Sequence, residues 1–347
     1  MIKKALKIVS IPVVLFALYI IGVISYATVT DYQPAPYHEL KVHKNAMDLG
    51  KDTLSFMTWN IGFTGLGKET DFFYDGGSVV TQTESLVKKN RTGILDYIAK
   101  ANDIDFYLLQ EVDSCSKRSH YHNHLDEIQK VLPGSDYAFA LNYNVDFVPV
   151  PLTDPMGKVK SGVATYSKHP LNATERIGFD SQMAWPTKLF FLDRCCIKTS
   201  TQLESDKKLF IYNTHCSAYD TAGTMVASEV DLIMSDARKE FEKGNYVVIG
   251  GDWNQCPPSY TPLGPPEAYN EFSLRNDQID EGWKWVADET VFSNRKLNTV
   301  YEKGKSYTSV IDHYLISPNV EVLNIQGIDL NFEFSDHQPV VLKVALN

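Results

Sequence analysis

Hydrophobic residues along the chain fall into short blocks rich in β-branched and aromatic side chains. Six of these blocks, each bounded by polar or turn-forming residues, predict β-strands at 54–59, 106–109, 162–166, 209–212, 246–249 and 340–344. Two other stretches repeat apolar residues every three or four positions, which predicts helices over 86–99 and 221–241. Strands that alternate with helices are typical of the α/β class. Further strand-like blocks without helices between them indicate more antiparallel pairing than a doubly wound sheet has.

The first thirty residues follow a different pattern. Lys3, Lys4 and Lys7 precede an almost continuous apolar run over 8–24. A basic flank before roughly 17 apolar residues is typical of a signal peptide or of a short membrane anchor. Small residues around Ala27 would allow cleavage there, but the run is long for a cleaved signal, so we favour an uncleaved anchor over 1–30. By the positive-inside rule the lysines stay in the cytoplasm. We therefore expect the rest of the chain to lie outside it, either tethered to the membrane or secreted.

The remainder of the chain shows one break in composition. Residues 31–51 contain Pro34 and Pro36 among mixed polar residues and are predicted to be a linker. Residues 52–347 contain no internal repeat and are predicted to form one domain. With 44% hydrophobic and 22% charged residues, the chain is neither disordered nor a coiled coil, and its net charge of −10 argues against a nucleic-acid packaging protein. The five cysteines include no C-x-x-C pair and predict no disulfide framework.

Polar side chains collect where the apolar blocks begin or end. These residues are Asn60, Glu111, Asn213 with His215, Asp252 with Asn254, Asp312, and Asp336 with His337. Because strand ends meet at one rim of a sheet, where sites in α/β proteins tend to form, we expect these side chains to converge.

The composition of this set restricts the reaction. Glu111 in an oxygen-rich neighbourhood suits a hard divalent cation such as Mg²⁺ rather than zinc. Two histidines can provide a general base and a hydrogen-bond donor to a negatively charged oxygen. No Ser or Cys lies in a nucleophile elbow, and the glycine-rich stretch 62–67 lacks the Lys-Ser/Thr pair of a phosphate-binding loop. Metal-assisted attack of water on phosphorus therefore fits these groups better than covalent catalysis does.

Six sequence motifs carry a family resemblance. They are TWNIG, LLQEVD, NTHCSAYD, GGDWN, SVIDHYLIS and SDHQPV. In order and approximate spacing they resemble the endonuclease/exonuclease/phosphatase superfamily, the group of the pancreatic-type deoxyribonuclease. The resemblance spans about residues 52–347. It implies a catalytic domain with a four-layer α/β sandwich, in which two mainly antiparallel sheets pack face to face with helices outside.

The resemblance also implies roles for individual residues. Glu111 is similar to the principal metal ligand and Asp336 lies close to the metal, which we expect to be Mg²⁺, with Mn²⁺ or Ca²⁺ as alternatives. Asn60 and Asn213 are assigned to phosphate binding, and Asn60 also to holding the metal. One position departs from the family pattern. Gly62 replaces a polar residue that many members carry, which puts a second metal site in doubt.

The catalytic groups follow from the same resemblance. Asp252 and Asn254 resemble the pair that positions the attacking water and a phosphate oxygen. His337 resembles the catalytic histidine, with Asp312 as the carboxylate that orients it. His215 resembles the second histidine, which stabilises the pentacovalent phosphate. Which of the two histidines deprotonates the water stays open.

We therefore expect a monomeric, exported or membrane-anchored hydrolase of phosphoesters, with phosphodiesters favoured, that acts by in-line attack of water. Three substrate classes remain open: nucleic acid, a phospholipid such as sphingomyelin, and soluble phosphoesters such as inositol phosphates. The segment HCSAYD is similar to that of secreted deoxyribonucleases and slightly favours a nuclease, whereas an anchor favours lipid headgroups. The alternative from another class is a catalytically inactive binding domain on a membrane tether.

Overall fold

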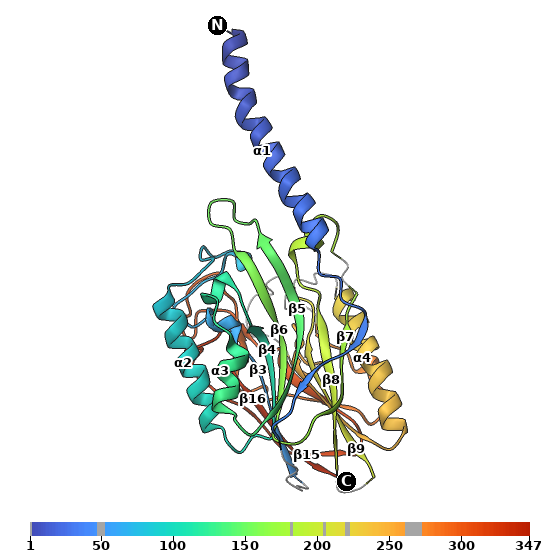
Figure 1. Cartoon of the computed structure of the whole chain (residues 1–347). Coiled ribbons are helices and arrows are strands. Elements are labelled where there is room, and N and C mark those ends of the chain that lie inside the picture. The colour runs from blue at the N-terminus through green and yellow to red at the C-terminus, as the bar shows by residue number, and fades with distance from the viewer. Residues whose placement is uncertain (1, 47–52, 181–182, 204–205, 219–222, 261–272) are drawn as a thin grey trace.

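Two seven-stranded β-sheets pack face to face at the centre of the molecule (Figure 1). The computed structural model describes residues 2–46, 53–180, 183–203, 206–218, 223–260 and 273–347. Helices α2 and α3 cover the outer face of one sheet and α4 covers the outer face of the other, while α1 projects away from the domain. This is the four-layer α/β sandwich that the family resemblance implies.

Most neighbouring strands are antiparallel, but two pairs at the centre are parallel: β3 with β4, and β9 with β10. The first sheet has the order β1 (Tyr37–Glu39), β7 (Asn172–Gly178), β8 (Cys195–Gln202), β9 (Lys208–His215), β10 (Tyr246–Asp252), β14 (Asp312–Ile316), β11 (Lys284–Val286). The second sheet has the order β15 (Val320–Gly327), β16 (Val340–Leu346), β3 (Thr53–Asn60), β4 (Phe106–Asp113), β6 (Gly157–Ser167), β5 (Asp136–Val148), β2 (Val42–His43). Strands β12 (Asn294–Arg295) and β13 (Thr308–Ser309) form a separate ribbon. The helices are α1 (Ile2–Thr30), α2 (Glu84–Lys100), α3 (His124–Val131) and α4 (Thr224–Glu242).

The six predicted strands lie within β3, β4, β6, β9, β10 and β16, and the two predicted helices correspond to α2 and α4. Residues 221–222 of the second predicted helix lie outside the described residues. Thr83 caps the start of helix α2: its Oγ1 accepts a hydrogen bond from the Leu86 amide and so satisfies one of the free N–H groups of the first turn. The helix buries Ile94 and Ile98 against its sheet.

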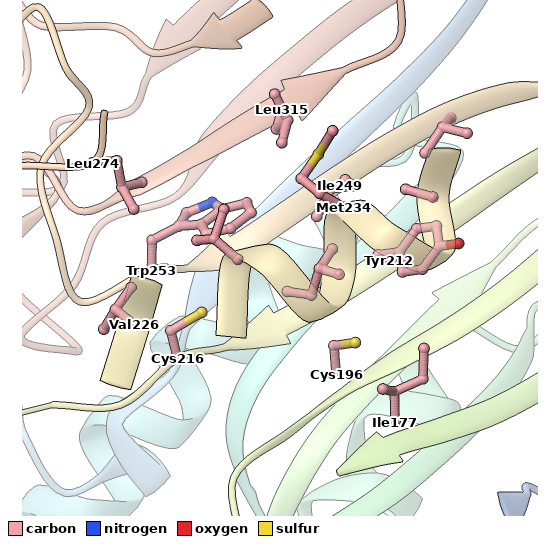
Figure 2. Close-up of a cluster of buried hydrophobic side chains, with 14 of the residues drawn as sticks. Ile177, Cys196, Tyr212, Cys216, Val226, Met234, Ile249, Trp253, Leu274 and Leu315 are labelled. Carbon is pink, nitrogen blue, oxygen red and sulfur yellow. The ribbon is translucent and has the colours of Figure 1, made fainter. Parts of the chain in front are cut away.

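The three largest hydrophobic clusters lie between successive layers of the sandwich. Between the sheets, fully buried side chains such as Phe56, Leu108, Ile211 and Leu342 interlock. Beneath α4, a second cluster packs that helix onto the outer face of the first sheet and includes Trp253 (Figure 2). The third cluster packs α2 and α3 onto the other sheet.

The predicted linker over 31–51 contains two short strands in its described part. Residues 37–39 form β1, which pairs with β7, and residues 42–43 form β2, which pairs with β5. Both are edge positions, where a strand otherwise leaves unpaired N–H and C=O groups that a passing extended segment can bond. The segment therefore runs along the domain and closes one edge of each sheet; residues 47–51 lie outside the described part.

Helix α1 contains a segment, Ile11–Thr30, that is long and apolar enough to cross a membrane. It is also the kind of segment found in signal sequences, so the N-terminal anchor stays a prediction. Its side chains from Ile11 onward are mostly exposed, including Leu15 at 61% and Ile21 at 60%.

Candidate active site

Three of the predicted residues lie in one row across the first sheet. Asp252 ends β10 and pairs in register with His215, the last residue of β9, and with Asp312, the first residue of β14. Adjacent strands lie about 4.8 Å apart, so this register alone brings the three side chains together. All three are at most 2% exposed. Nε2 of His215 lies 3.5 Å from Oδ2 of Asp252.

Asn60, at the end of β3, joins this row to the second sheet. Its Nδ2 donates to Oδ2 of Asp252 at 3.0 Å and to Oε1 of Glu111 at 3.3 Å. Its Oδ1 accepts from the Gly62 amide at 3.0 Å. The side chain thus holds two carboxylates in place. Asn60 also lines the cavity, so its predicted part in holding the metal or the phosphate stays a prediction.

Glu111 is turned into the site by a β-bulge. The pairing of β4 with β6 shifts register between Leu109 and Val112. Glu111 has a backbone φ of +54°, which residues other than glycine rarely adopt. Such strain persists where the surroundings hold it and is common at functional sites. Gln110, the other residue of the bulge, points between the sheets instead and donates to Oδ1 of Asn213 at 2.7 Å.

Asn213 is the predicted residue that the structure places apart from the others. Besides accepting from Gln110, it donates through Nδ2 to the Ala164 carbonyl at 2.9 Å and to Thr165 at 3.2 Å. It is fully buried between the sheets and, like Asp312, is not among the residues that line the cavity. Its contacts tie β9 to β4 and β6 and do not favour the predicted role in phosphate binding.

Trp253 anchors the end of β10, so that the residues on either side of it in the sequence, Asp252 and Asn254, face the site. Its indole is buried in the cluster beneath α4 (Figure 2) and donates to the His313 carbonyl at 2.9 Å. Asp252 and Asn254 therefore face the cavity. Asn254 has a φ of +53°, and its Nδ2 donates to the Cys216 carbonyl at 2.9 Å. Because that bond uses the NH₂ end of the amide, the end available to the cavity is Oδ1, an acceptor.

His337 is held by Asp312, as the resemblance implies. Nδ1 of the imidazole lies 2.8 Å from Oδ2 of Asp312, so Nδ1–H donates to that carboxylate. Nε2 lies 3.7 Å from Oδ2 of Asp252 and 4.0 Å from Oδ2 of Asp336. Burial opposes a charge on His337, but the carboxylates of Asp312 and Asp252 outweigh it and raise the imidazole pKa well above its ordinary value.

His215 has the opposite electrostatic environment. Burial, Arg194 and the nearby His337 lower its pKa well below the ordinary value, so the imidazole is neutral at pH 7. The two histidines on either side of Asp252 thus differ in protonation: one is an imidazolium donor and the other a neutral ring.

Glu111, Asp336 and Asn60 fit a divalent cation. Burial and the nearby carboxylate of Glu111 more than offset the effect of His337 and raise the pKa of Asp336 to about 7. Two carboxylates that face one buried cavity repel each other unless a cation lies between them, and oxygen donors of this kind suit Mg²⁺, Mn²⁺ or Ca²⁺. Asp252, Asp312 and His337 also approach one another within 4.8 Å, but Asp312 and His337 already share a hydrogen bond, which fits an orienting pair better than a ligand set.

Gly62 makes room for Asp336. A Cβ at this position would lie 2.6 Å from Oδ1 of Asp336 and 3.0 Å from Oγ of Ser335, and the backbone has a φ of +49°. The residue that departs from the family pattern is therefore one that the local packing requires to be glycine.

The cavity extends from these polar groups to an apolar wall. That wall consists of Phe63, Leu66, Phe72, Tyr74, Met156 and Leu297. Three arginines also line the cavity: Arg118, Arg194 and Arg295. Arg118 is bidentate to Asp113 at 2.9 and 3.2 Å, and its guanidinium lies 3.9 Å from the centre of the Phe63 ring.

Sequence reasoning missed several supporting residues. Nδ2 of Asn294 lies 3.1 Å from Nε2 of His337, and Ser293 accepts through Oγ from the Asp312 amide at 3.0 Å. Glu229 of α4 also lines the cavity and accepts from the Ser217 amide at 2.8 Å. Asn294 begins the two-residue strand β12 and Ser293 directly precedes it, and this short segment has no apolar periodicity that would have marked either residue. Glu229 lies on the buried face of a predicted helix. A carboxylate at such a position needs a partner, and this could have identified it as a candidate site residue.

Comparisons with known proteins agree with this geometry. Residues 57–337 match the model of the Endonuclease/Exonuclease/phosphatase family. A search of curated proteins found no significant match. The structure resembles an endonuclease/exonuclease/phosphatase from Bacteroides vulgatus, with a TM-score of 0.55, 17% identity and coverage of 86% of this chain and 100% of that one. It also resembles D. rerio TDP2 complexed with single-strand DNA product, with a TM-score of 0.54, 14% identity and coverage of 85% and 99%.

A third similar structure is ANGEL2, described as a 2′,3′-cyclic phosphatase, with a TM-score of 0.57, 15% identity and coverage of 89% of this chain and 99% of that one. At these identities the likeness establishes the fold, and the family model establishes membership. The chain therefore belongs to the Endonuclease/Exonuclease/phosphatase family and is a phosphoric ester hydrolase, as its six motifs predict.

Proposed function

We propose that this protein hydrolyses phosphodiesters with the help of a divalent cation, and that α1 anchors it in a membrane with the catalytic domain outside the cytoplasm. One observation carries the catalytic part. Oδ2 of Asp252 lies 3.5 Å from Nε2 of His215 and 3.7 Å from Nε2 of His337. The amide of Asn60 links the same oxygen to Glu111. A carboxylate, two histidines and a metal-binding carboxylate thus surround one small volume of the cavity.

Each group has a chemical task in this arrangement. Glu111 and Asp336, with the Asn60 amide beside them, would hold the cation, which neutralises charge on the phosphate oxygens when bound. We favour Mg²⁺. Asp252 and Oδ1 of Asn254 are acceptors that orient the attacking water, and the carboxylate of Asp252 takes up its proton. The imidazolium of His337 donates through Nε2 to a phosphate oxygen, where its charge stabilises the transition state most.

The apolar wall of the cavity restricts the classes of substrate that fit. Phe63, Phe72 and Tyr74 offer aromatic surface next to the polar groups, which suits a phosphoester with a bulky apolar or planar substituent. This favours a nucleotide or lipid phosphodiester over an inositol phosphate, whose substituents are all polar. The similarity to TDP2 in complex with single-strand DNA supports the nuclease alternative, and the apolar helix α1 supports the lipid alternative. We further propose that the protein is a monomer.

A substrate panel tests this proposal. The full chain in detergent micelles is assayed with bis(p-nitrophenyl) phosphate, plasmid DNA, RNA, sphingomyelin vesicles and inositol phosphates, in Mg²⁺, Mn²⁺, Ca²⁺ or excess chelator. We expect turnover of at least one diester that disappears with chelator and returns with Mg²⁺. No metal-dependent turnover on any substrate would favour the alternative of an inactive binding domain on a membrane tether.

A further inference from the structure

The last turns of α1 are attached to the catalytic domain. Oη of Tyr26 donates to Oδ2 of Asp146 in β5 at 3.1 Å. Ala27 is only 8% exposed, whereas most of the helix from Ile11 onward is exposed. Tyr26 and Ala27 line a crevice together with Phe147 of β5 and Leu189 of the short helix η4 (Thr187–Phe190). The point at which α1 meets the domain is therefore fixed with respect to the β5 end and to η4.

Exposed hydrophobic side chains gather at the same end. The loop 149–156 connects β5 to β6 and presents Val150 at 39% and Leu152 at 57% exposure. Trp185, two residues before η4, is 61% exposed. Figure 1 shows the β5–β6 connection on the side of the domain from which α1 projects. Outside α1, only four other large hydrophobic side chains are exposed among the described residues: Tyr37, Tyr121, Val300 and Leu323.

The chemistry of this end suits a lipid surface. Prolines at 149, 151 and 155 restrict the backbone of the loop, so its apolar tips are presented with little loss of conformational freedom on insertion. Tryptophan is enriched where membranes meet water, because its ring is apolar and its N–H is polar. Lys188, two residues into η4, is exposed and long enough to reach phosphate groups while its stem stays in apolar surroundings.

We propose that loop 149–156 and Trp185 form a second membrane contact, in which Val150, Leu152 and Trp185 enter the headgroup region of the bilayer that holds α1. The inference rests on the proposed membrane anchor. Phe147 and five residues of α1, from Leu18 to Tyr26, line a common recess, so the end of β5 lies beside a part of α1 that belongs to the apolar span. A domain held so closely to an embedded helix brings its nearest apolar loops to the lipid surface.

This contact would place the catalytic cavity at the membrane. Met156, the last residue of the loop, lines the cavity, and so do Met183, Phe191 and Leu192, which flank Trp185 and η4 along the chain. The segments that touch lipid are thus continuous with the cavity wall. The substrate class that follows is a membrane phosphodiester with an apolar tail, which reaches the cavity from the bilayer surface.

Depth measurements on the full chain test the contact without any need for activity. A nitroxide label is attached to L152C or, as the control, to L323C, each in a C115S background, because Cys115 is the one cysteine that is not buried. Leu323 is similarly exposed, at 47%, on β15, which Figure 1 places away from α1. In phosphatidylcholine vesicles we expect the label at 152 to collide more often with oxygen than with a water-soluble nickel complex, and the label at 323 to show the reverse. The same aqueous behaviour at both positions would overturn the proposal.

An activity comparison tests the consequence for the substrate. In the L152S/W185S double variant we expect unchanged hydrolysis of bis(p-nitrophenyl) phosphate but a loss of roughly tenfold or more on sphingomyelin or phosphatidylcholine in vesicles, with L323S as the control. Equal loss on both substrates, or no vesicle lipid hydrolysis by the wild type, would overturn the substrate class. Failure of the proposed function is distinguishable, because it would abolish hydrolysis of the soluble diester by the wild type while leaving the depth of the label at 152 unchanged.

Discussion

Nδ1 of His337 lies 2.8 Å from Oδ2 of Asp312, and both side chains are buried, at 5% and 0% exposure. Asp312 begins β14 in one sheet, and His337 lies shortly before β16 in the other. The pair therefore bridges the two sheets at the rim of the sandwich. It fixes which nitrogen of His337 faces the cavity, and the carboxylate stabilises the imidazolium.

Replacement of Asp312 by Asn tests this pair. The variant keeps a hydrogen-bond acceptor near Nδ1 but removes the negative charge, so the imidazolium loses stabilisation. We expect kcat for a soluble diester to fall by about 10²–10³-fold. Since the carboxylate raises the pKa of His337, the limb of the pH–rate profile that requires the protonated ring should move to lower pH. The control is D329N, at an exposed aspartate; a change of less than about threefold in D312N would contradict the assignment.

Glu111→Gln should act mainly on the metal requirement. The variant retains the size of the side chain and the contact with Asn60 but loses the charge that attracts a cation. We expect the Mg²⁺ concentration for half-maximal activity to rise by roughly 10- to 100-fold, measured by titration of the hydrolysis rate. Glu302→Gln, on the surface, should leave the titration unchanged. An unaltered Mg²⁺ requirement in the Glu111 variant would remove this residue from the metal site.

Gly62→Ala should damage the site more than a comparable glycine substitution elsewhere. At Gly62 the added Cβ would lie 2.6 Å from Asp336, whereas at Gly76, where φ is +89°, nothing lies within 4 Å of it. Both variants carry the cost of a positive φ, about 1 kcal/mol. Only G62A displaces a cavity carboxylate, so we expect its activity to fall by roughly tenfold or more. Equal kcat values in G62A and G76A would show that Asp336 tolerates displacement.

The stability of the protein should depend on pH through Glu229. Burial raises the pKa of this carboxyl to about 7, against the hydrogen bonds from Ser217. A folded-state pKa above the ordinary value means that the protonated form stabilises the fold. That contribution is complete below about pH 4.5 and is lost as the pH rises to about 7, with a total of roughly 3 kcal/mol.

Thermal unfolding in micelles at pH 5 and pH 8 measures this effect. Between pH 5 and pH 8 the Tm of the wild type should fall relative to the Tm of E229Q, because Glu229 ionises over this range and Gln cannot. E302Q, whose carboxylate is exposed in the wild type, serves as the control. A Tm difference between wild type and E229Q that does not change with pH would contradict a pKa of about 7 for Glu229 in the folded protein.

The sequence predicts most of the polar side chains that the structure brings to one cavity, because apolar blocks that end in polar residues mark strand ends. Asp252 and His215 each lie three residues after the end of such a block, and their strands prove to be parallel neighbours in register. Depth along a strand is harder to predict. Asn213 and His215 lie on the same face of β9, but only His215, the last residue of the strand, reaches the cavity. Asn213, two residues earlier, lies between the sheets.

Other features were outside the reach of any pattern. The segment around β1 and β2 is rich in proline and polar residues, and its pairing depends on backbone groups at sheet edges that no side-chain pattern records. Asn294 contacts His337 only because the ribbon of β12 and β13 folds over the rim. The bulge at Glu111 is likewise a backbone feature, although the functional side chain that it turns was predicted.

The central claim is that Asp252 and His337 act together on a phosphodiester. Hydrolysis of bis(p-nitrophenyl) phosphate in saturating Mg²⁺ by the wild type, D252A and H337A tests it most directly, with circular dichroism to establish that each variant is folded. The geometry predicts that each substitution lowers kcat by at least about 10³-fold while the spectrum is unchanged. Near-normal rates in both folded variants would contradict the account.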